Sequence, residues 1–384
     1  MSGAATAGRA THVLLLCESL RVSGGVERFV CQLGNELVAR GLTVTIGNVD
    51  AERAAVVYPL DPRVRVAAGA ATMPKAPAAR GLGRALALLR ARWHVGRALS
   101  RVVDAARADV VVLNGVVDAC TLLALRPGWA ARCICCDHNH FDARSRLWRR
   151  LRARFYPRVA AVVSLSQADA PRFAALNANT RVIANASSLS ADAPAVPEPL
   201  RVIAVGRHQA QKGFDLLLRS WVEVVAALPS ARLRIVGEGP LRAELARLAT
   251  ELGVAASVDW TAPTPAIERL YREAAVFALS SRYEGMPLAL LEAQALGVPA
   301  VAFDCPTGPR DILTDDTGIV VAAGDLAAFA AAIVALLGDE PRRARMASAA
   351  IARSRSSFGL RRHVDRWSAL IDEVAARAAA PSPR

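Results

Sequence analysis

Short apolar runs alternate with longer stretches of helical periodicity along most of the chain. A run of about four to eight apolar residues between polar loops predicts a strand buried on both faces, as in a parallel sheet covered by helices. Repetition of this pattern predicts a doubly wound α/β architecture. The first series of predicted strands comprises residues 12–17, 42–46, 109–113, 133–136, 161–165 and 182–183. The second series comprises residues 201–205, 232–236, 257–260, 276–279, 300–303 and 319–321.

A proline-rich segment separates the two series of strands. Residues 189–199 contain three prolines and two acidic residues among small ones, which is typical of an interdomain linker. A length of 384 residues also favours two domains over one. We therefore expect two Rossmann-like domains that face a central cleft, at residues 1–188 and 200–358. Residues 359–384 are expected to form a C-terminal helix that packs back on the first domain and ends in a frayed tail.

Composition narrows the classes of function. The formal net charge is +14, and nearly every basic residue is Arg, with Lys only at Lys75 and Lys212. One interpretation of this excess of arginine is a GC-rich genome. The functional alternative is attraction to phosphorylated ligands or to anionic lipid. Aromatic residues make up 5% and form no stripe with basic residues, which argues against nucleic acid.

Cysteine usage and hydropathy indicate a cytoplasmic protein. The seven cysteines form no C-x-x-C pair, and Cys133, Cys135 and Cys136 lie in an apolar run, so we expect reduced, buried thiols. The first ten residues contain no apolar signal-peptide core. No apolar run reaches the roughly 18 residues of a membrane-spanning helix, so any membrane contact is expected to be peripheral, on the inner face.

Two Arg-rich helices could make such a contact. Residues 144–158 hold seven arginines, with Leu147, Trp148, Leu151 and Phe155 at helical spacing. The second helix, 81–106, is also rich in arginine. Arg80 directly precedes it, and Arg84, Arg90, Arg92, Arg97 and Arg101 lie within it. Both patterns are typical either of adsorption to anionic lipid or of a solvated helix face, and the two interpretations stay open.

The stretch from Ser281 to Glu292 carries the clearest chemistry. It predicts Glu284 in a loop and Pro287 at the first position of a helix, where its missing N–H costs no hydrogen bond. The free amides of Gly285, Met286 and Leu288 would then face an anion, which the helix dipole favours. Glu292 follows Glu284 by eight positions. Carboxylates on both sides of an anion site suit a phosphate with hydroxyl-rich groups on either side, as in a nucleotide sugar.

A second loop carries two cations. Gly206 and Arg207 follow one predicted strand, and Lys212 and Gly213 precede the next helix. The planar guanidinium of Arg207 and the compact ammonium of Lys212 together suit a diphosphate. The alternative is a surface loop with two solvated cations.

Three further loops lie at carboxyl ends of predicted strands, where doubly wound sheets bind ligands. Gly24-Gly25 and the Gly237-Glu-Gly-Pro240 turn allow close backbone approach, although Arg242 replaces the third glycine of a dinucleotide fingerprint. His138 lies two residues after a predicted strand and is the better candidate for the cleft, and His140 lies two residues further on. No further set of ligands accompanies this H-x-H pair apart from neighbouring aspartates, so no metal or other cofactor is expected.

Together these residues resemble the retaining glycosyltransferases of family 4, which have the GT-B fold. The resemblance covers nearly the whole chain: Glu284 and Glu292 match the paired-glutamate motif, and 24–28, 205–213 and 236–240 match the family's glycine loop and donor-phosphate segments. Ser164 and Asn185 match two further strand ends. The run 303–311 is similar to members that build bacterial capsule, O-antigen or lipid-linked oligosaccharides.

The resemblance implies a role for each matched residue. Glu284, His138, Arg207 and Lys212 would serve catalysis, and Glu292 would bind the ribose hydroxyls. The remaining donor-binding residues would be Gly24, Gly25, Gly237, Gly285, Met286, Pro287 and Leu288.

The reaction implied is transfer of a hexosyl or N-acetylhexosaminyl group, without a metal and with retention of configuration. The donor would be a UDP-sugar and the acceptor a glycan or lipid-linked sugar of a cell-surface polysaccharide. Three alternatives stay open: a nicotinamide-dependent oxidoreductase, a sugar-nucleotide epimerase, and a non-catalytic scaffold at a membrane surface.

Overall fold

The computed structural model describes residues 11–22, 24–50, 52–69 and 81–380, with no side-chain description at 81, 82, 84 and 85. The chain divides into two compact units. The first unit comprises Met1–Ser164, Ala170–Ile183 and Val364–Arg384, and the second comprises Leu165–Asp169 and Ala184–His363. Lys75 and Arg80 lie outside the described residues.

The first unit is built on a seven-stranded parallel sheet in the order β3-β2-β1-β4-β5-β6-β7. Its strands are β1 His12–Leu16, β2 Thr43–Asn48, β3 Arg65–Ala68, β4 Val110–Asn114, β5 Cys133–Cys136, β6 Ala161–Ser164 and β7 Thr180–Val182. Six of the seven agree with the predicted strands to within about two residues. The missed strand β3 is a four-residue edge strand with no fully buried side chain, so it leaves no apolar run in the sequence.

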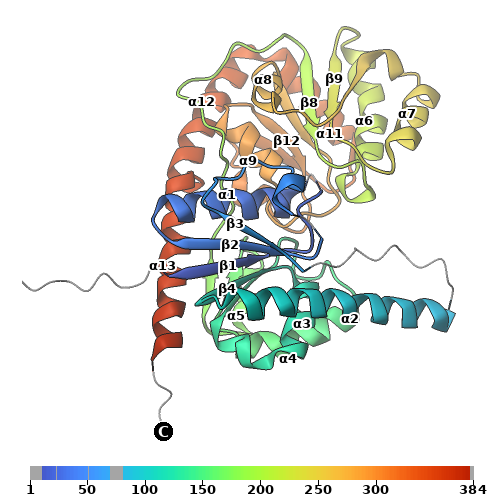
Figure 1. The fold of residues 1–384 in the computed structure, drawn as a ribbon. Helices are drawn as coiled ribbons and strands as arrows, with labels where there is room; N and C mark the ends of the chain where they lie inside the picture. Colours follow the sequence, from blue (N-terminus) through green and yellow to red (C-terminus); the bar gives the residue numbers. More distant parts are fainter. Residues whose placement is uncertain (1–10, 23, 51, 70–80, 381–384) are drawn as a thin grey trace, which may run out of the picture. The chain divides into compact units, whose positions relative to one another are not determined.

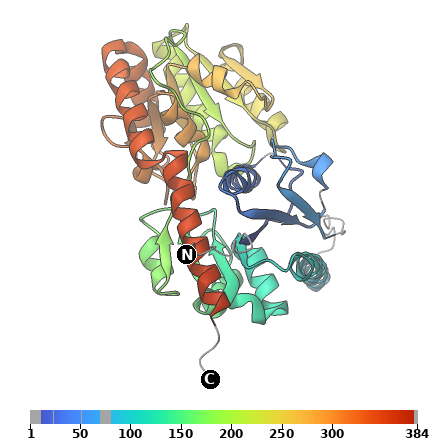
Figure 2. The same ribbon diagram turned by 60° about the vertical axis from the view of Figure 1, so that its left-hand side comes forward.

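Helices cover both faces of this sheet. They are α1 Gly25–Ala39, α2 Gly81–Ala106, α3 Val116–Leu125, α4 Arg146–Phe155, α5 Ala170–Ala174 and α13 Leu360–Ala379, with 3₁₀ turns at Arg53–Ala55, Pro127–Arg132 and Tyr156–Arg158. α1 lies on one face and α2 on the other (Figures 1 and 2). α13 packs beside α1, where the Phe29 and Trp367 rings are 5.7 Å apart.

The second unit contains a six-stranded parallel sheet in the order β10-β9-β8-β11-β12-β13. Its strands are β8 Arg201–Val205, β9 Arg232–Val236, β10 Val258–Thr261, β11 Val276–Leu279, β12 Ala300–Phe303 and β13 Gly318–Val321. Its helices are α6 Phe214–Ala227, α7 Arg242–Glu251, α8 Ile267–Arg272, α9 Leu288–Ala295, α10 Pro309–Ile312, α11 Leu326–Gly338 and α12 Glu340–Ser357, with 3₁₀ turns at Ala210–Lys212 and Ala255–Ser257. All six strands agree with the predicted ones to within about one residue, although β9 and β10 contain charged residues among their apolar ones.

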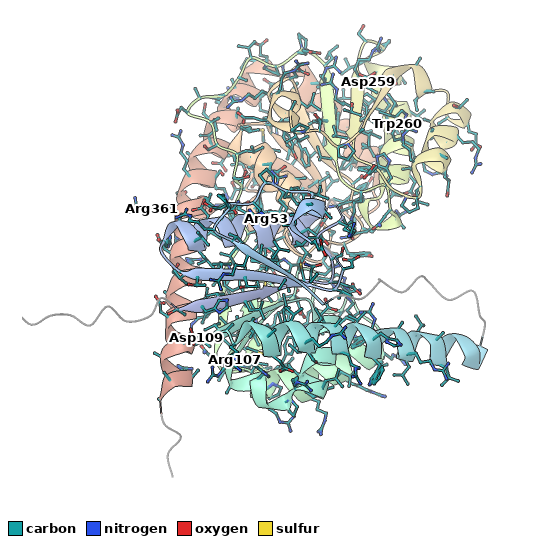
Figure 3. All side chains as sticks on the ribbon, in the orientation of Figure 1. Arg53, Arg107, Asp109, Asp259, Trp260 and Arg361 are labelled. Atoms are coloured by element: carbon teal, nitrogen blue, oxygen red, sulfur yellow. The ribbon has the colours of Figure 1, made fainter. Side chains whose placement is uncertain are left out.

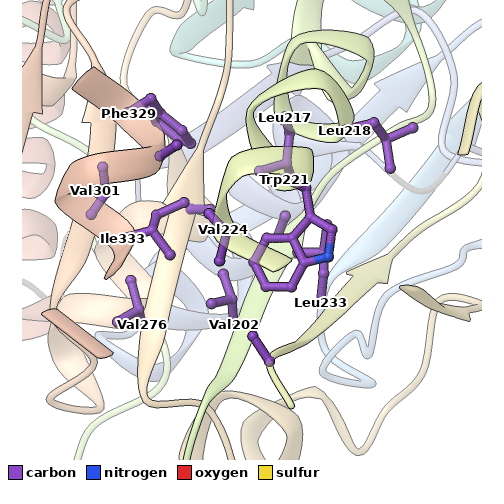
Figure 4. Packing of buried hydrophobic residues seen from close by; sticks show 14 of the residues in the cluster. Val202, Leu217, Leu218, Trp221, Val224, Leu233, Val276, Val301, Phe329 and Ile333 are labelled. Atoms are coloured by element: carbon purple, nitrogen blue, oxygen red, sulfur yellow. The ribbon is translucent and has the colours of Figure 1, made fainter. Parts of the chain in front are cut away.

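The core of the second unit forms where α6 and α11 pack on the sheet (Figure 4). Trp221 is fully buried there, and its indole Nε1 donates to Ser257 Oγ at 2.9 Å. A buried Trp N–H needs such an acceptor, since an unpaired donor would cost free energy of folding.

Both sheets confirm the predicted doubly wound α/β class, and each reverses its strand order once. The reversal falls between β1 and β4 in the first sheet and between β8 and β11 in the second. Ligands of such sheets bind outside the carboxyl ends of the strands at this point. Each unit therefore has one edge at which functional residues are expected.

The second unit begins at Ala184, ahead of the predicted linker 189–199, and it also includes one short segment earlier in the chain. Leu165–Asp169 follows β6 but belongs to the second unit. The backbone amide of Gln167 donates to Asp311 Oδ1 at 2.9 Å, which ties the segment to α10. A contact between residues so far apart in the chain has no signature in the local sequence.

Candidate active site

The N-terminus of α9 forms the centre of the site in the second unit (Figure 1). Pro287, predicted as the first helical residue, is instead the N-cap, with φ −68° and ψ 108°, and the helix begins at Leu288. The reason is that its extended ψ keeps the proline outside the helix while its carbonyl accepts the first helical bond, from the Leu290 amide at 3.1 Å. Within the described residues, the amides of Gly285, Met286 and Leu288 donate no hydrogen bond.

Side chains from three other elements hold the loop before α9 by its carbonyl groups. Thr307 Oγ1 donates to the Glu284 carbonyl at 2.6 Å, and Asn185 Nδ2 donates to the Met286 carbonyl at 3.1 Å. Gln211 Nε2 donates to the Tyr283 carbonyl at 3.0 Å. Since the carbonyls are used by the scaffold, the amides stay available to an anion.

Lys212 and Glu284 meet at the point where the sheet reverses. Lys212 ends the 3₁₀ turn after β8, Glu284 follows β11, and Nζ lies 2.6 Å from Oε1. Their side chains are 18% and 7% exposed. Ser281 Oγ also donates to Glu284 Oε1, at 2.6 Å, and Ser280 Oγ donates to the Lys212 carbonyl at 2.9 Å. Neither serine was predicted as a site residue, although Ser281 opens the stretch that led to Glu284 and Ser280 directly precedes it.

Two glycines of the site are required by packing. Gly213 has φ +62°, and a Cβ there would lie 2.1 Å from the Ser280 carbonyl oxygen. Gly237 has φ +141°, and its Cβ would lie 2.1 Å from the carbonyl oxygen of Gly206. Only glycine tolerates both the torsion and the contact. The close backbone approach expected at Gly237 is thus an approach to the loop that contains Gly206.

Arg207 differs from Lys212 in having no partner. Its side chain is exposed and, within the part of the chain that the structure describes, makes no hydrogen bond or ion pair. The next residue, His208, is fully buried, with its ring 5.6 Å from the rings of both Phe214 and Trp260, the latter labelled in Figure 3. Burial, together with the nearby Arg242, lowers the pKa of His208 to about 4. His208 is therefore neutral at physiological pH, and Arg207 carries the exposed positive charge of this loop.

Glu292 lies within α9 and is 2% exposed. The hydroxyl of Tyr271, from α8, is 3.0 Å from Glu292 Oε2 and 3.2 Å from the Ala289 carbonyl oxygen. Tyr271 was not predicted, because nothing near it in the sequence points to Glu292. This contact orients the Glu292 carboxylate.

The remaining predicted residues belong to the first unit. Gly24 is the N-cap of α1, which begins at Gly25. The Gly24 carbonyl accepts hydrogen bonds from the Arg28 amide at 3.1 Å and the Tyr58 hydroxyl at 3.2 Å. Like the loop before α9, this turn is held by its carbonyl, at the edge where its sheet reverses.

His138 follows β5 and contacts two neighbours, an amide and an aromatic ring. Its Nε2 is 3.0 Å from Asn114 Oδ1, and its ring centroid is 4.6 Å from that of Phe29. Asn114 Nδ2 donates to the Leu16 carbonyl at 3.0 Å, which makes Oδ1 the acceptor for His138. Nε2 therefore carries the proton when the imidazole is neutral.

Asp137 is a structural residue. It is buried and pairs with Arg152 at 3.1 Å, and the Tyr156 hydroxyl donates to its other oxygen. Burial raises the pKa of Asp137, against the lowering effect of Arg152. The Arg152 guanidinium also lies over the Phe141 ring, 3.5 Å from its centroid.

This arrangement corrects one interpretation of the Arg-rich helix 144–158. Arg152 is 2% exposed, and its guanidinium pairs with Asp137 inside the protein. The interleaved Trp148, Leu151 and Phe155 pack on the core of the first unit, because that is the apolar surface nearest to them. The apolar stripe of α4 is consequently unavailable to lipid, and only Leu147 is largely exposed, at 61%.

A further acidic residue near the reversal of the first sheet was missed. Asp118, in the first turn of α3, is 6% exposed, and its Oδ1 lies 3.6 Å from Arg92 Nη1. Arg92 also pairs with Glu18, at 2.6 Å. Burial and the neighbouring Glu18 raise the pKa of Asp118 to about 7. The three residues lie on separate elements, so no local pattern could have joined them.

The structure thus assembles Lys212, Glu284 and the amides at the start of α9 within the second unit. Among the described residues, no group of three or more His, Cys, Asp or Glu side chains could hold a metal ion. All seven cysteines are buried and free. None of the helices among the described residues is both long and apolar enough to span a bilayer.

Two family models match the chain. Residues 23–190 match "Glycosyltransferase Family 4", and residues 199–339 match "Glycosyl transferases group 1". The amylovoran biosynthesis glycosyltransferase AmsD of Erwinia amylovora is 29% identical over 369 residues, which cover 94% of this chain and 99% of that protein. The lipopolysaccharide core biosynthesis glycosyltransferase LpsE of Rhizobium meliloti is 34% identical over 158 residues, 41% of this chain and 43% of the relative.

Solved structures show the same fold. Sucrose-phosphate synthase from Thermosynechococcus elongatus superposes with a TM-score of 0.79 at 19% identity, covering 95% of this chain and 99% of the other. HepE of Anabaena, in complex with UDP and glucose, superposes with a TM-score of 0.73 at 19% identity, covering 94% and 100%. With two doubly wound sheets and family models that match both halves, this chain belongs to the family 4-like glycosyltransferases with the GT-B fold and is related to enzymes of polysaccharide biosynthesis.

Proposed function

We propose that this glycosyltransferase transfers a hexosyl or N-acetylhexosaminyl group from a UDP-sugar, with retention of configuration and without a metal ion. The acceptor would be a glycan or lipid-linked sugar in cell-surface polysaccharide synthesis. The observation that carries the proposal is the 2.6 Å pair of Lys212 and Glu284 beside the amides of Gly285, Met286 and Leu288, which donate no hydrogen bond within the described part of the chain.

The chemistry of glycosyl transfer accounts for this arrangement. When the bond between the sugar and the phosphate breaks, negative charge develops on the leaving diphosphate. The Lys212 ammonium has two further N–H groups besides the one directed at Glu284, and Arg207 is unpaired among the described residues. Preorganised donors of this kind lower the barrier electrostatically, so a metal is not required.

The two glutamates would act on opposite sides of that diphosphate. Glu284, held by Lys212 and Ser281, would face the transferred sugar and support the positive charge that develops there. Glu292, oriented by Tyr271, would accept hydrogen bonds from the ribose hydroxyls. The roles of His138, Gly24 and Gly25, which lie in the first unit, stay predictions from the family resemblance.

The choice of donor and acceptor is supported by the relatives. HepE is described in complex with UDP and glucose, and AmsD and LpsE are named for polysaccharide synthesis. None of the matched proteins described above is an oxidoreductase or an epimerase, which leaves those alternatives without support.

A ligand panel followed by a turnover assay tests the proposal. We expect UDP and UDP-sugars to raise the melting temperature, and GDP-sugars and NAD to leave it unchanged. The best UDP-sugar should be hydrolysed slowly in EDTA, and NMR should show that the sugar is first released with its original anomeric configuration. A rise in melting temperature with NAD alone would contradict the UDP-sugar donor. Loss of turnover in EDTA that a divalent cation restores would contradict metal independence, and release of the inverted anomer would contradict retention.

A further inference from the structure

Exposed apolar side chains gather on one helix of the first unit. Nine large apolar residues are exposed in the part of the chain that the structure describes, and four of them lie on α2. The exposed fractions are 56% for Leu86, 46% for Leu88, 68% for Leu89 and 48% for Trp93. Single exposed apolar residues are ordinary, but a group on one element indicates an interaction surface.

Three of these residues form a stripe on the outer side of α2. At about 100° per residue, Leu86, Leu89 and Trp93 fall within about 60° of one another around the helix. The buried residues Val95 and Leu99 lie on the opposite side and pack in the core of the first unit. α2 therefore has two apolar sides, and folding of the unit uses only one of them.

Positive charge flanks the outer stripe. Arg90 and Arg97 are exposed on the same side of α2, and the Arg97 guanidinium lies 4.7 Å from the centroid of the Trp93 ring. The only acidic residue in α2 is Asp104, which pairs with Arg126 at 2.8 Å. The N-terminal half of α2 extends past α3 and α4 of the same unit (Figure 1), so this stripe is accessible along its length within the unit.

α4 adds charge to the same layer of helices. α3 packs against both α2 and α4, and the three helices lie together below the sheet in Figure 1. Arg146, Arg150 and Arg154 of α4 are exposed, and no acidic residue interrupts the helix. Because its apolar side packs against the core of the first unit, α4 contributes attraction to anions without an apolar contact.

We propose that the outer stripe of α2, Leu86, Leu89 and Trp93 with Arg90 and Arg97, docks onto an anionic lipid bilayer, assisted by the exposed arginines of α4. An apolar stripe bordered by arginines is the pattern of helices that lie in the plane of a membrane interface. Indole rings partition to that depth, and arginine side chains keep their charge at the headgroups. The inference concerns the first unit alone and does not rest on the identity of the sugar donor.

Sedimentation of the full-length protein with lipid vesicles tests the proposal. We expect binding to vesicles of phosphatidylglycerol and phosphatidylcholine, weaker binding in 0.5 M salt, and little binding to phosphatidylcholine alone. The double variant Leu89→Gln, Trp93→Gln should partition at least about tenfold less, since each side chain contributes on the order of 1 kcal/mol of apolar transfer. Val222→Gln, at a residue of α6 that is 36% exposed, is the matched control and should bind as the wild type does.

A second measurement keeps the proposal testable if the double variant folds poorly. Brominated lipid should quench part of the wild-type fluorescence, and Trp93→Phe should remove that quenching while it keeps vesicle binding. Equal vesicle binding by wild type and double variant, quenching unchanged in Trp93→Phe, or no vesicle binding at all would overturn the proposal. So would an oligomer that forms without lipid and is lost in the double variant, because the stripe would then be a protein interface. No acceptor or donor is present in these experiments, so their failure is separate from failure of the proposed reaction.

Discussion

Replacement of Lys212 by alanine tests the assignment of the site most directly. The change removes the ammonium that lies 2.6 Å from Glu284 Oε1. If Lys212 stabilises the leaving diphosphate, its loss should lower kcat by about 10²–10³, which is typical for one preorganised donor. The unpaired Glu284 carboxylate would then also repel the phosphate, so the larger end of that range is expected.

The same change lowers stability by a smaller amount. Removing one partner of a fully buried ion pair costs about 3–5 kcal/mol, but the Lys212 side chain is 18% exposed and Ser281 still donates to Glu284. We therefore expect a loss of about 1–3 kcal/mol in the free energy of unfolding. Domains are stable by roughly 5–15 kcal/mol, so the variant should stay folded at 25 °C.

A double variant separates the two effects. Adding Glu284→Gln to Lys212→Ala removes the unpaired charge and should restore most of the stability, as measured by urea denaturation. Turnover of the nucleotide sugar should stay low, because the diphosphate still lacks its cation. If Lys212→Ala keeps turnover within about threefold of the wild type, or if turnover recovers together with stability in the double variant, Lys212 is only a structural counter-ion.

Three other side chains yield predictions. Tyr271→Phe removes the hydroxyl 3.0 Å from Glu292 Oε2 and should raise the KM for the donor about tenfold in steady-state kinetics, whereas an unchanged KM would argue against a ribose role for Glu292. In the folded protein the pKa of Asp118 is raised to about 7, so ionisation of its carboxyl opposes folding. The stability that the neutral carboxyl contributes is therefore lost as the pH rises from about 4 to about 7. Denaturation at pH 5 and pH 8 should show that wild type loses about 2 kcal/mol relative to Asp118→Asn over this interval, and parallel pH curves would contradict that pKa. Arg152→Met leaves Asp137 buried without its 3.1 Å partner and should cost about 3–5 kcal/mol in urea denaturation, while a loss under 1 kcal/mol would mean that the pair is dispensable.

Most strands could be predicted from the sequence because they are short apolar runs between polar loops. In the second unit every predicted strand is present, and the central strands β11 and β12 show the continuous apolar signal of burial on both faces of a parallel sheet. β3 left no such signal because it is short and lies at an edge. The position of Pro287 was wrong by one residue, since the same proline suits an N-cap and a first helical turn equally well in the sequence.

The residues of the candidate site also fall into two groups, those that the sequence predicted and those that only the structure revealed. Glu284, Glu292, Arg207 and Lys212 were found from two local motifs, a helix start with its glycine and a loop with two cations, and only the fold brings Lys212 and Glu284 together. The side chains that hold them, such as Thr307, Tyr271 and Asn185, come from other elements and were visible only once the chain was folded. Likewise the Arg-rich segments looked alike as sequences, and folding buried Arg152 and the apolar side of α4 while it left the outer stripe of α2 exposed.

The sequence by itself thus determined the α/β class, the division into two series of strands and the loop chemistry that indicates a phosphorylated donor. Those properties depend on periodicity and on residues within about ten positions of one another. Only the tertiary structure decided which charges are paired, which glycines serve packing and which apolar helix face stays outside. These depend on contacts between distant segments, and a linear pattern carries no information on which segments meet.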